Sequence, residues 1–218
     1  MGNFSLKFDK FWETFIKYNG YVKVLEGLKN TLTIAVLGLI IGIVIGTLIA
    51  TARVIPQYKV LPRILNKICS FYVALFRGTP IVVQLLVFYY VLLPLMGSRM
   101  TGIQVAVMVF GLNSAAYISE IMRGGIMSVD SGQMEAGRAV GLSFGTTMLK
   151  IVIPQAVKNI LPTMGNELIA LIKDTSVVSF VGATDLYVAF SFIGSSNYEF
   201  MVPYLVMALI YIVLVLII

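Results

Sequence analysis

The stretch from Thr31 to Ala52 reads TLTIAVLGLIIGIVIGTLIATA and decides the fold class. It carries no charged residue, and its length is close to the ~20 residues that a helix needs to cross a bilayer. Gly38, Gly42 and Gly46 recur within it at intervals of four residues. This spacing places the glycines on one face of a helix, where a neighbouring helix can approach closely. We therefore predict a membrane-spanning helix with a closely packed glycine face.

The composition of the whole chain agrees with a membrane protein. Of its 218 residues, 59% are hydrophobic and only 12% are charged, about half the charged fraction of a soluble domain. The mean hydropathy is +0.95. The chain has no histidine, which excludes histidine-based catalysis, metal binding and proton relays. Cys69 is the single cysteine, so neither an internal disulfide nor a cysteine-rich metal cluster is expected.

Further apolar stretches predict an all-α membrane protein with about five transmembrane helices. After Thr31–Ala52 they are Ile81–Met96, Ile103–Ile121, Gln155–Leu171 with a shorter apolar piece at Val177–Ala189, and Phe200–Ile218. We expect an N-terminal segment at residues 1–29 and a transmembrane domain at residues 30–218, with an inner loop at residues 124–154.

Residues 1–29 place aromatic side chains on one helical face and charges on the other. Two interpretations stay open: an amphipathic helix that lies at the membrane surface, or a helix packed on the transmembrane bundle. Charges interrupt this segment throughout, so we expect no cleavable signal peptide. The aromatic residues are Phe4, Phe8, Phe11, Trp12 and Phe15.

The distribution of basic residues predicts the orientation in the membrane. Five basic residues follow the first span and four lie in or near the second inner loop, whereas the outer turns hold only Arg99. Because basic loops stay on the cytoplasmic side, we expect the loop and the C-terminus in the cytoplasm and the N-terminus outside. Five lysines of the N-terminal segment oppose this rule. The net charge of +6 fits inner loops beside anionic lipid better than nucleic-acid binding.

The inner loop has the residues of a compact helical turn. Asp130 suits a helix N-cap, with Gln133 three residues later able to reach back to it. Gly141 suits the left-handed residue that ends a helix, and Ser143 can cap a second short helix. We expect Glu135 to hold the loop together through the backbone or through Arg138. Such a loop, with small side chains at its surface, is a candidate docking site.

Five residues of this loop resemble the EAA signature of ATP-binding-cassette importer permeases. Glu135, Ala136, Gly141, Ile151 and Pro154 match its spacing, while Gly137 replaces the second alanine and Ile153 replaces a leucine. The resemblance implies that the loop docks on a separate ATPase subunit, which binds ATP and Mg²⁺. This chain has no G-x-x-x-x-G-K-[ST] phosphate loop, so we expect no cofactor, no metal site and no enzymatic activity on it. The residues expected to couple to the ATPase are Glu135, Ala136, Gly137, Gly141, Ile151 and Pro154.

Other stretches resemble the polar amino-acid subgroup of these permeases, which serves histidine, glutamate, glutamine, arginine, lysine and opines. They are FRGTP at Phe76–Pro80 with Gln84 after it, NSAAY at Asn113–Tyr117, and Asn166-Glu167 followed by Lys173–Ser176. The resemblance implies an importer in a bacterial cytoplasmic membrane, with a type I fold. It also implies a second permease chain, identical or closely related, a dimer of ATPase subunits and an external solute-binding protein.

Polar residues inside the predicted spans are the candidates for substrate binding, because such residues are costly in a membrane. Glu167 and Asn166 could accept hydrogen bonds from a substrate ammonium, and Thr79, Gln84 and Ser114 could donate to its carboxylate. This set favours a basic or amide amino acid. An internal ion pair of Glu167 with Arg77 or Lys173 is the alternative, and Glu120 is expected to pair with Arg123. The full candidate set is Thr79, Gln84, Asn113, Ser114, Tyr117, Thr163, Asn166 and Glu167.

Two other function classes remain open from the sequence. A secondary transporter or channel that works without ATP would normally show an inverted repeat or a proton relay, and neither is visible here. A membrane scaffold without transport would show no substrate-dependent ATP turnover in an assembled complex.

Overall fold

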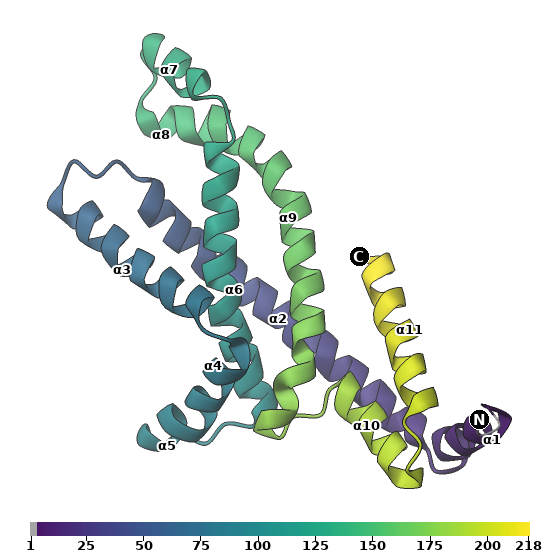
Figure 1. The fold of residues 1–218 in the computed structure, drawn as a ribbon. Helices are drawn as coiled ribbons and strands as arrows, with labels where there is room; N and C mark the ends of the chain where they lie inside the picture. The colour runs from purple at the N-terminus through teal and green to yellow at the C-terminus, as the bar shows by residue number, and fades with distance from the viewer. Residues whose placement is uncertain (1–3) are drawn as a thin grey trace. The chain divides into compact units, whose positions relative to one another are not determined.

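The computed structural model describes residues 4–218, and all regular secondary structure in that part of the chain is helical (Figure 1). Helices α2 (Gly20–Val54) and α6 (Gly102–Met127) are long and apolar enough to cross a membrane. Two bent helix pairs, Val60–Gly78 with Ile81–Leu95 and Phe144–Val181 with Leu186–Asn197, raise the number of candidate spans to four. Helix α11 (Met201–Ile217) is shorter but apolar. The five apolar stretches predicted from the sequence fall on these elements, but by length and composition only two to four of the elements qualify as spans.

The described chain divides into two compact units that each take parts of the long helices. Unit 1 comprises residues 1–37, 82–109 and 169–218, and unit 2 comprises residues 38–81 and 110–168. The remaining elements are α1 (Phe4–Trp12), η1 (Glu13–Lys17), α3 (Val60–Gly78), α4 (Ile81–Val87), η2 (Phe88–Leu92), α5 (Leu93–Leu95), α7 (Ser131–Ala139), α8 (Phe144–Thr147), η3 (Met148–Val152), α9 (Ile153–Asp174), η4 (Thr175–Val181) and α10 (Leu186–Asn197).

Unit 1 packs α1, the start of α2, α10 and α11 around an apolar core. Phe11 of α1 is buried in this core together with Val24, Phe190 and Ile193. Asp185 caps α10 by accepting hydrogen bonds from the backbone N–H groups of Tyr187 and Val188. One face of the N-terminal segment is therefore packed, as one of the two interpretations expected, while Phe4, Phe8 and Trp12 on the same segment stay exposed.

Unit 2 depends on the glycine face of α2, which the structure places against α6 as predicted. A Cβ atom added to Gly42 would lie 2.7 Å from the Oγ atom of Ser114, and one added to Gly46 would lie 2.9 Å from Ile118. Gly38 approaches Phe110 in the same way. The absence of side chains at these positions lets the two backbones come close. This approach fixes the position of α6, which carries the candidate residues Asn113, Ser114 and Tyr117.

The segment between the first span and Pro80 was expected to be an inner loop, but most of it is helical. Residues 60–78 form helix α3, which carries Arg63, Lys67 and Arg77. Its three basic residues are exposed, whereas Val73 and Phe76 are buried, so one face packs while the other stays exposed. Tyr72 anchors the packed face by donating a hydrogen bond to the carbonyl of Leu112 on α6 at 2.6 Å. The chain breaks at Pro80, because α3 ends at Gly78 and α4 begins at Ile81.

Candidate functional site

A hydrogen bond between α6 and α9 lies at the centre of the candidate site. The fully buried Ser114 donates from its Oγ atom to Oε1 of Glu167 at 2.9 Å. A carboxylate inside a membrane element needs a polar partner, because it is costly to bury alone. Gly42 makes room for this contact, since a side chain there would collide with Ser114. Two residues from distant predicted motifs are thus brought together.

The end of α3 approaches α6 beside this contact. Asn113 donates from Nδ2 to the carbonyl oxygen of Phe76 at 3.3 Å. The guanidinium carbon of Arg77 lies 5.2 Å from the centre of the Tyr117 ring, within range of a cation–π interaction. Thr79 follows directly and donates to the carbonyl of Leu75 at 2.8 Å. The FRGTP and NSAAY stretches are therefore neighbours in the fold, which sequence spacing alone did not show.

The other candidate substrate residues have different surroundings. Thr163 is exposed and donates to the carbonyl of Asn159 at 3.4 Å. It lines a cavity of about 310 Å³ together with Glu120 and Ser128. Asn166 is exposed on α9. Gln84 is buried within unit 1. Unit 2 thus gathers Thr79, Asn113, Ser114, Tyr117 and Glu167, while Thr163 and Asn166 lie at its surface.

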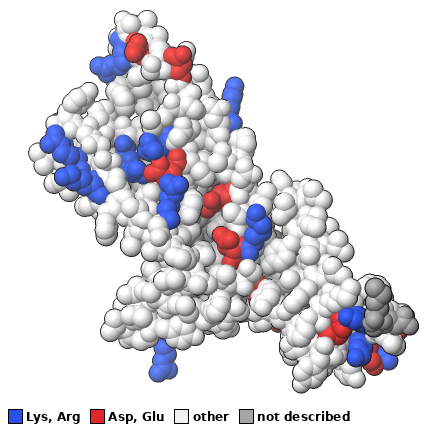
Figure 2. All heavy atoms as spheres, in the orientation of Figure 1, with Lys and Arg blue, Asp and Glu red and all other residues white. Residues whose placement is uncertain are grey.

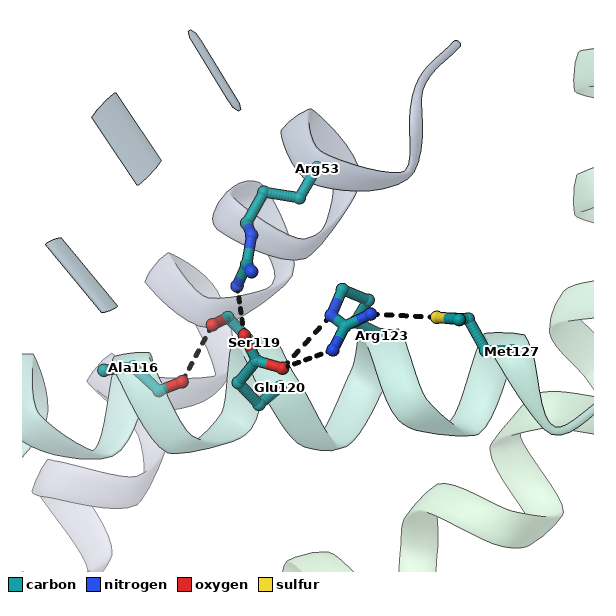
Figure 3. Close-up of polar contacts among 6 residues, drawn as sticks. All are labelled: Arg53, Ala116, Ser119, Glu120, Arg123 and Met127. Atoms are coloured by element: carbon teal, nitrogen blue, oxygen red, sulfur yellow. Dashed lines mark hydrogen bonds and ion pairs between the residues drawn. The ribbon is translucent and has the colours of Figure 1, made fainter. Parts of the chain in front are cut away.

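Three charged residues of unit 2, Arg53, Glu120 and Arg123, form what we call the arginine cluster (Figure 3). Arg53, at the end of α2, donates from Nη1 to Oε1 of Glu120 on α6. Arg123 donates from Nε at 3.1 Å and from Nη2 at 2.9 Å to Oε2 of the same carboxylate. The pairing of Glu120 with Arg123 was predicted. Arg53 was missed, because no pattern in the sequence links residues so far apart.

The turn between α6 and α9 forms a projecting structure, the elbow, which consists of α7, α8 and the residues between them (Figure 1). Asp130 accepts a hydrogen bond from the Gly132 N–H at 2.6 Å, and Ser143 accepts one from the Thr146 N–H at 3.2 Å. Gly141 has a φ of +86°, a conformation that favours glycine. These three local predictions are confirmed. The elbow therefore has the compact helical form that its sequence indicated.

The elbow also explains one departure from the EAA signature. Gly137 is buried against α8, and a Cβ atom there would collide with the side chain of Thr147. An alanine at this position would push the two short helices apart. The glycine therefore suits this chain, in which the buried Thr147 donates from its hydroxyl to the carbonyl of Ser143 at 3.0 Å.

Two expectations for side chains of the elbow were wrong. Gln133 does not reach back to Asp130; its Oε1 atom accepts a hydrogen bond from Gln155 at 3.3 Å. This contact joins α7 to the start of α9 instead of closing the cap. Glu135 is exposed, and no ion pair joins it to Arg138 or to any other residue of 4–218. It is free to face a partner because hydrogen bonds elsewhere hold the elbow.

The remaining residues of the signature divide between surface and interior. Ala136 and Pro154 are exposed, and Ile151 is partly buried. Charged side chains gather over α3 and the elbow in the space-filling view (Figure 2). An exposed face of α7 with small and charged residues is suited to contact with another protein.

Comparisons with known proteins agree on a transport permease. Residues 38–218 match the family described as binding-protein-dependent transport system inner membrane component. The chain is 40% identical over 194 residues to the arginine transport system permease protein ArtQ of Bacillus subtilis, covering 89% of this chain and 86% of that protein. It is 37% identical over 208 residues to the putative glutamine transport system permease protein GlnP of Rickettsia bellii, covering 95% and 93%.

Solved structures of related transporters have the same fold. The crystal structure of an amino acid ABC transporter with histidines gives a TM-score of 0.83 at 36% identity, covering 93% of this chain and 91% of that one. An inward-facing structure of the MetNI methionine ABC transporter gives a TM-score of 0.73 at 20% identity, covering 89% and 90%, and shows the fold alone. Sequence, fold and matched length together show that this chain belongs to the family of binding-protein-dependent transport system inner membrane components.

Proposed function

We propose that this chain is the permease subunit of an ATP-driven importer for polar amino acids, including basic ones. The observation that carries the proposal is the position of Glu167, whose carboxylate is fixed by Ser114 within the helices of unit 2. An ammonium or guanidinium group requires such an acceptor, and the helices around it are otherwise mostly apolar. The names of the arginine and glutamine permeases similar to this chain support the same substrate class.

The neighbouring polar groups complete the proposed substrate site. Asn113 and Tyr117 lie on the same face of α6 as Ser114, and Thr79 follows Arg77 at the end of α3. In our proposal Glu167, oriented by the Ser114 hydroxyl, takes the cationic group. The Asn113 amide, together with the Thr79 hydroxyl once it rotates away from the Leu75 carbonyl, donates to the carboxylate.

The elbow supplies the proposed coupling to ATP hydrolysis. Its exposed Glu135 and Ala136 would contact a separate ATPase subunit. That subunit's movement would reach α9 through the hydrogen bond between Gln155 and Gln133, and the bond between Asn159 and Ser128 would link α9 to the end of α6. ATP and Mg²⁺ would bind to a dimer of such ATPases, and this chain would catalyse no reaction. A second permease chain and an external solute-binding protein complete the proposed assembly.

The orientation in the membrane follows from the same proposal. The elbow and the C-terminus face the cytoplasm and the N-terminus faces outward, in a bacterial cytoplasmic membrane. The basic residues of α3 and the elbow support this orientation. A variant with Cys69→Ser and Ala136→Cys, expressed without the ATPase subunit so that the elbow stays uncovered, tests it in whole cells. A membrane-impermeant thiol reagent should label it only after the membrane is opened, and labelling of intact cells would contradict the orientation.

The transport function is tested with the assembled complex in proteoliposomes. Uptake should require ATP inside the vesicle and the solute-binding protein outside. Of the twenty amino acids tested, the basic or amide ones should raise the rate of ATP hydrolysis. The variant Glu167→Gln should reduce uptake of a basic amino acid at least ~10-fold, because one hydrogen bond to a charged group is worth about 1.5–3 kcal/mol. Glu13→Gln is the matched control. Uptake driven by an ion gradient without ATPase would overturn the proposal.

The coupling role of the elbow has a separate test. Gly141→Pro removes the left-handed turn, and Ala136→Trp places a large side chain on the exposed face of α7. Both variants should insert into the membrane normally but lose ATPase binding and transport. Gly145→Ala is the control, because a side chain there meets open space. Normal transport by Ala136→Trp would show that this face does not contact the ATPase.

A further inference from the structure

A polar cavity in unit 1 has no role in the function proposed above. It has a volume of about 540 Å³, which lies in the range of small-molecule sites. It lies between η1, the beginning of α2 and the end of α10. Its lining residues are Lys10, Glu13, Thr14, Tyr18, Lys23, Phe192, Ser196 and Asn197.

Hydrogen bonds fix one wall of this cavity. Asn197 donates from Nδ2 both to the carbonyl oxygen of Lys10 and to Oγ1 of Thr14, each at 3.1 Å. Thr14 is buried, and its hydroxyl in turn donates to the same Lys10 carbonyl at 3.2 Å. At the turn into α2, a side chain on Gly20 would come within 2.9 Å of the Thr14 carbonyl oxygen. Specific hydrogen bonds among Asn197, Thr14 and the Lys10 carbonyl therefore define this wall of the cavity.

The cavity carries positive charge without a matching carboxylate. Glu13 is paired with Lys17 at 3.3 Å, so its charge is already balanced. Within residues 4–218, neither Lys10 nor Lys23 forms an ion pair. The Lys23 ammonium lies 3.4 Å from the centre of the Phe192 ring, which holds it at the cavity. Two ammonium groups are thus available to one anion.

The surroundings of the cavity indicate its depth in the membrane. Tyr18 is 73% exposed and Tyr198, next to Asn197, is 92% exposed. Trp12 on the preceding helix is also exposed, together with the apolar Phe8 and Ile16. Exposed tryptophan and tyrosine side chains concentrate at the boundary between lipid and water, at the level of the headgroups. Phosphate groups of lipids are the anions that are abundant at this level.

We propose that this cavity binds the headgroup of an anionic phospholipid such as phosphatidylglycerol. Lys10 and Lys23 contact the phosphate oxygens, and the hydroxyl groups of Ser196 and Tyr18 bond the glycerol. The exposed apolar residues of α1 and η1 lie beside the acyl chains. An anionic lipid fits better than a zwitterionic one, because the amine of the latter would add a further positive charge beside two lysines. The bound lipid would hold the N-terminal segment on unit 1.

Native mass spectrometry of the assembled permease complex tests this inference. The complex from nanodiscs of equal phosphatidylglycerol and phosphatidylcholine should retain phosphatidylglycerol, and Lys10→Ala with Lys23→Ala should lower its occupancy at least ~10-fold. Lys10→Arg with Lys23→Arg should preserve retention. Lys59→Ala is the control, since this lysine is exposed outside the cavity. Thermal melting of each variant in detergent checks that the fold is intact.

The other outcomes of this experiment overturn the proposal. Equal retention of both lipids, or unchanged retention in the double alanine variant, would exclude an anionic-lipid site. Full displacement of the lipid by millimolar inorganic phosphate would assign the cavity to a free anion. Loss of solute-binding-protein association without loss of lipid would assign the lysines to an acidic protein surface. None of these results depends on which amino acid is transported.

Discussion

Two groups of basic residues, one in each unit, differ in what surrounds them. In the arginine cluster of unit 2, Arg53 and Arg123 share the carboxylate of Glu120. In the cavity of unit 1, Lys10 and Lys23 line an open space and have no carboxylate partner within the described chain. Arginine suits the first role because its planar guanidinium binds a carboxylate with several donors. The comparison separates charges that hold the fold together from charges available to a ligand.

The largest expected effect comes from removing the acid of the arginine cluster. Glu120→Gln leaves two largely buried guanidinium groups without a countercharge, and we expect a loss of about 2–4 kcal/mol in stability. Thermal unfolding of the purified complex in detergent, followed by intrinsic fluorescence, measures this loss. Glu120→Asp, which keeps the charge, is the control. A Glu120→Gln variant as stable as the parent would show that the arginine cluster does not hold the fold together, and would contradict its distinction from the cavity lysines.

The glycine face of α2 offers a second test of the arginine cluster, because this face sets how closely Arg53 approaches Glu120. Gly46→Val adds side-chain atoms where a Cβ alone would lie 2.9 Å from Ile118. We expect a loss of about 1–3 kcal/mol from overpacking. In the double variant with Gly46→Val and Glu120→Gln, the loss of stability should be smaller than the sum of the two single losses, since both changes disrupt the contact of Arg53 with Glu120. Strict additivity in the melting experiments would show that the cluster and the glycine face are independent.

The lysines of unit 1 should contribute much less to stability. Lys23→Ala removes a cation–π contact with Phe192, which is worth about 0.5–1 kcal/mol at an exposed site. We expect a decrease of that size in detergent that contains no anionic lipid. Added phosphatidylglycerol should raise the melting temperature of the parent more than that of the variant. A loss as large as that of Glu120→Gln would place Lys23 among the structural charges.

The smallest effect is expected for the exposed pair of Glu13 and Lys17. Their side chains are 49% and 72% exposed, and a pair of this kind on a helix surface contributes about 0.3–0.5 kcal/mol. Glu13→Gln should therefore change the melting temperature little. It should also raise the positive charge beside the cavity and so increase retention of anionic lipid in the mass spectrometric experiment. Weaker retention would contradict the role that we assign to charge.

Local chemistry could be read correctly from the sequence. Asp130, Gly141 and Ser143 shape the elbow through contacts with residues two or three positions away, or through their own backbone conformation. The break before Pro80 has the same local origin, because proline restricts the residue that precedes it. The side chains of Gln133 and Glu135 were misjudged. The contact of Gln133 with Gln155, and the lack of an ion pair for Glu135 within residues 4–218, depend on how the elbow folds back on α9. No local rule describes how the elbow folds back.

The sequence by itself determined that this is a helical membrane protein, that α2 has a glycine face, and where the short helices of the elbow are capped. These properties follow from hydropathy, residue spacing and capping, which act over a few residues. Only the tertiary structure decided that Ser114 meets Glu167, that Arg53 joins Glu120 and Arg123, and that α3 is a helix packed on α6. Those contacts depend on the angle and register at which long helices cross, which many distant side chains set together.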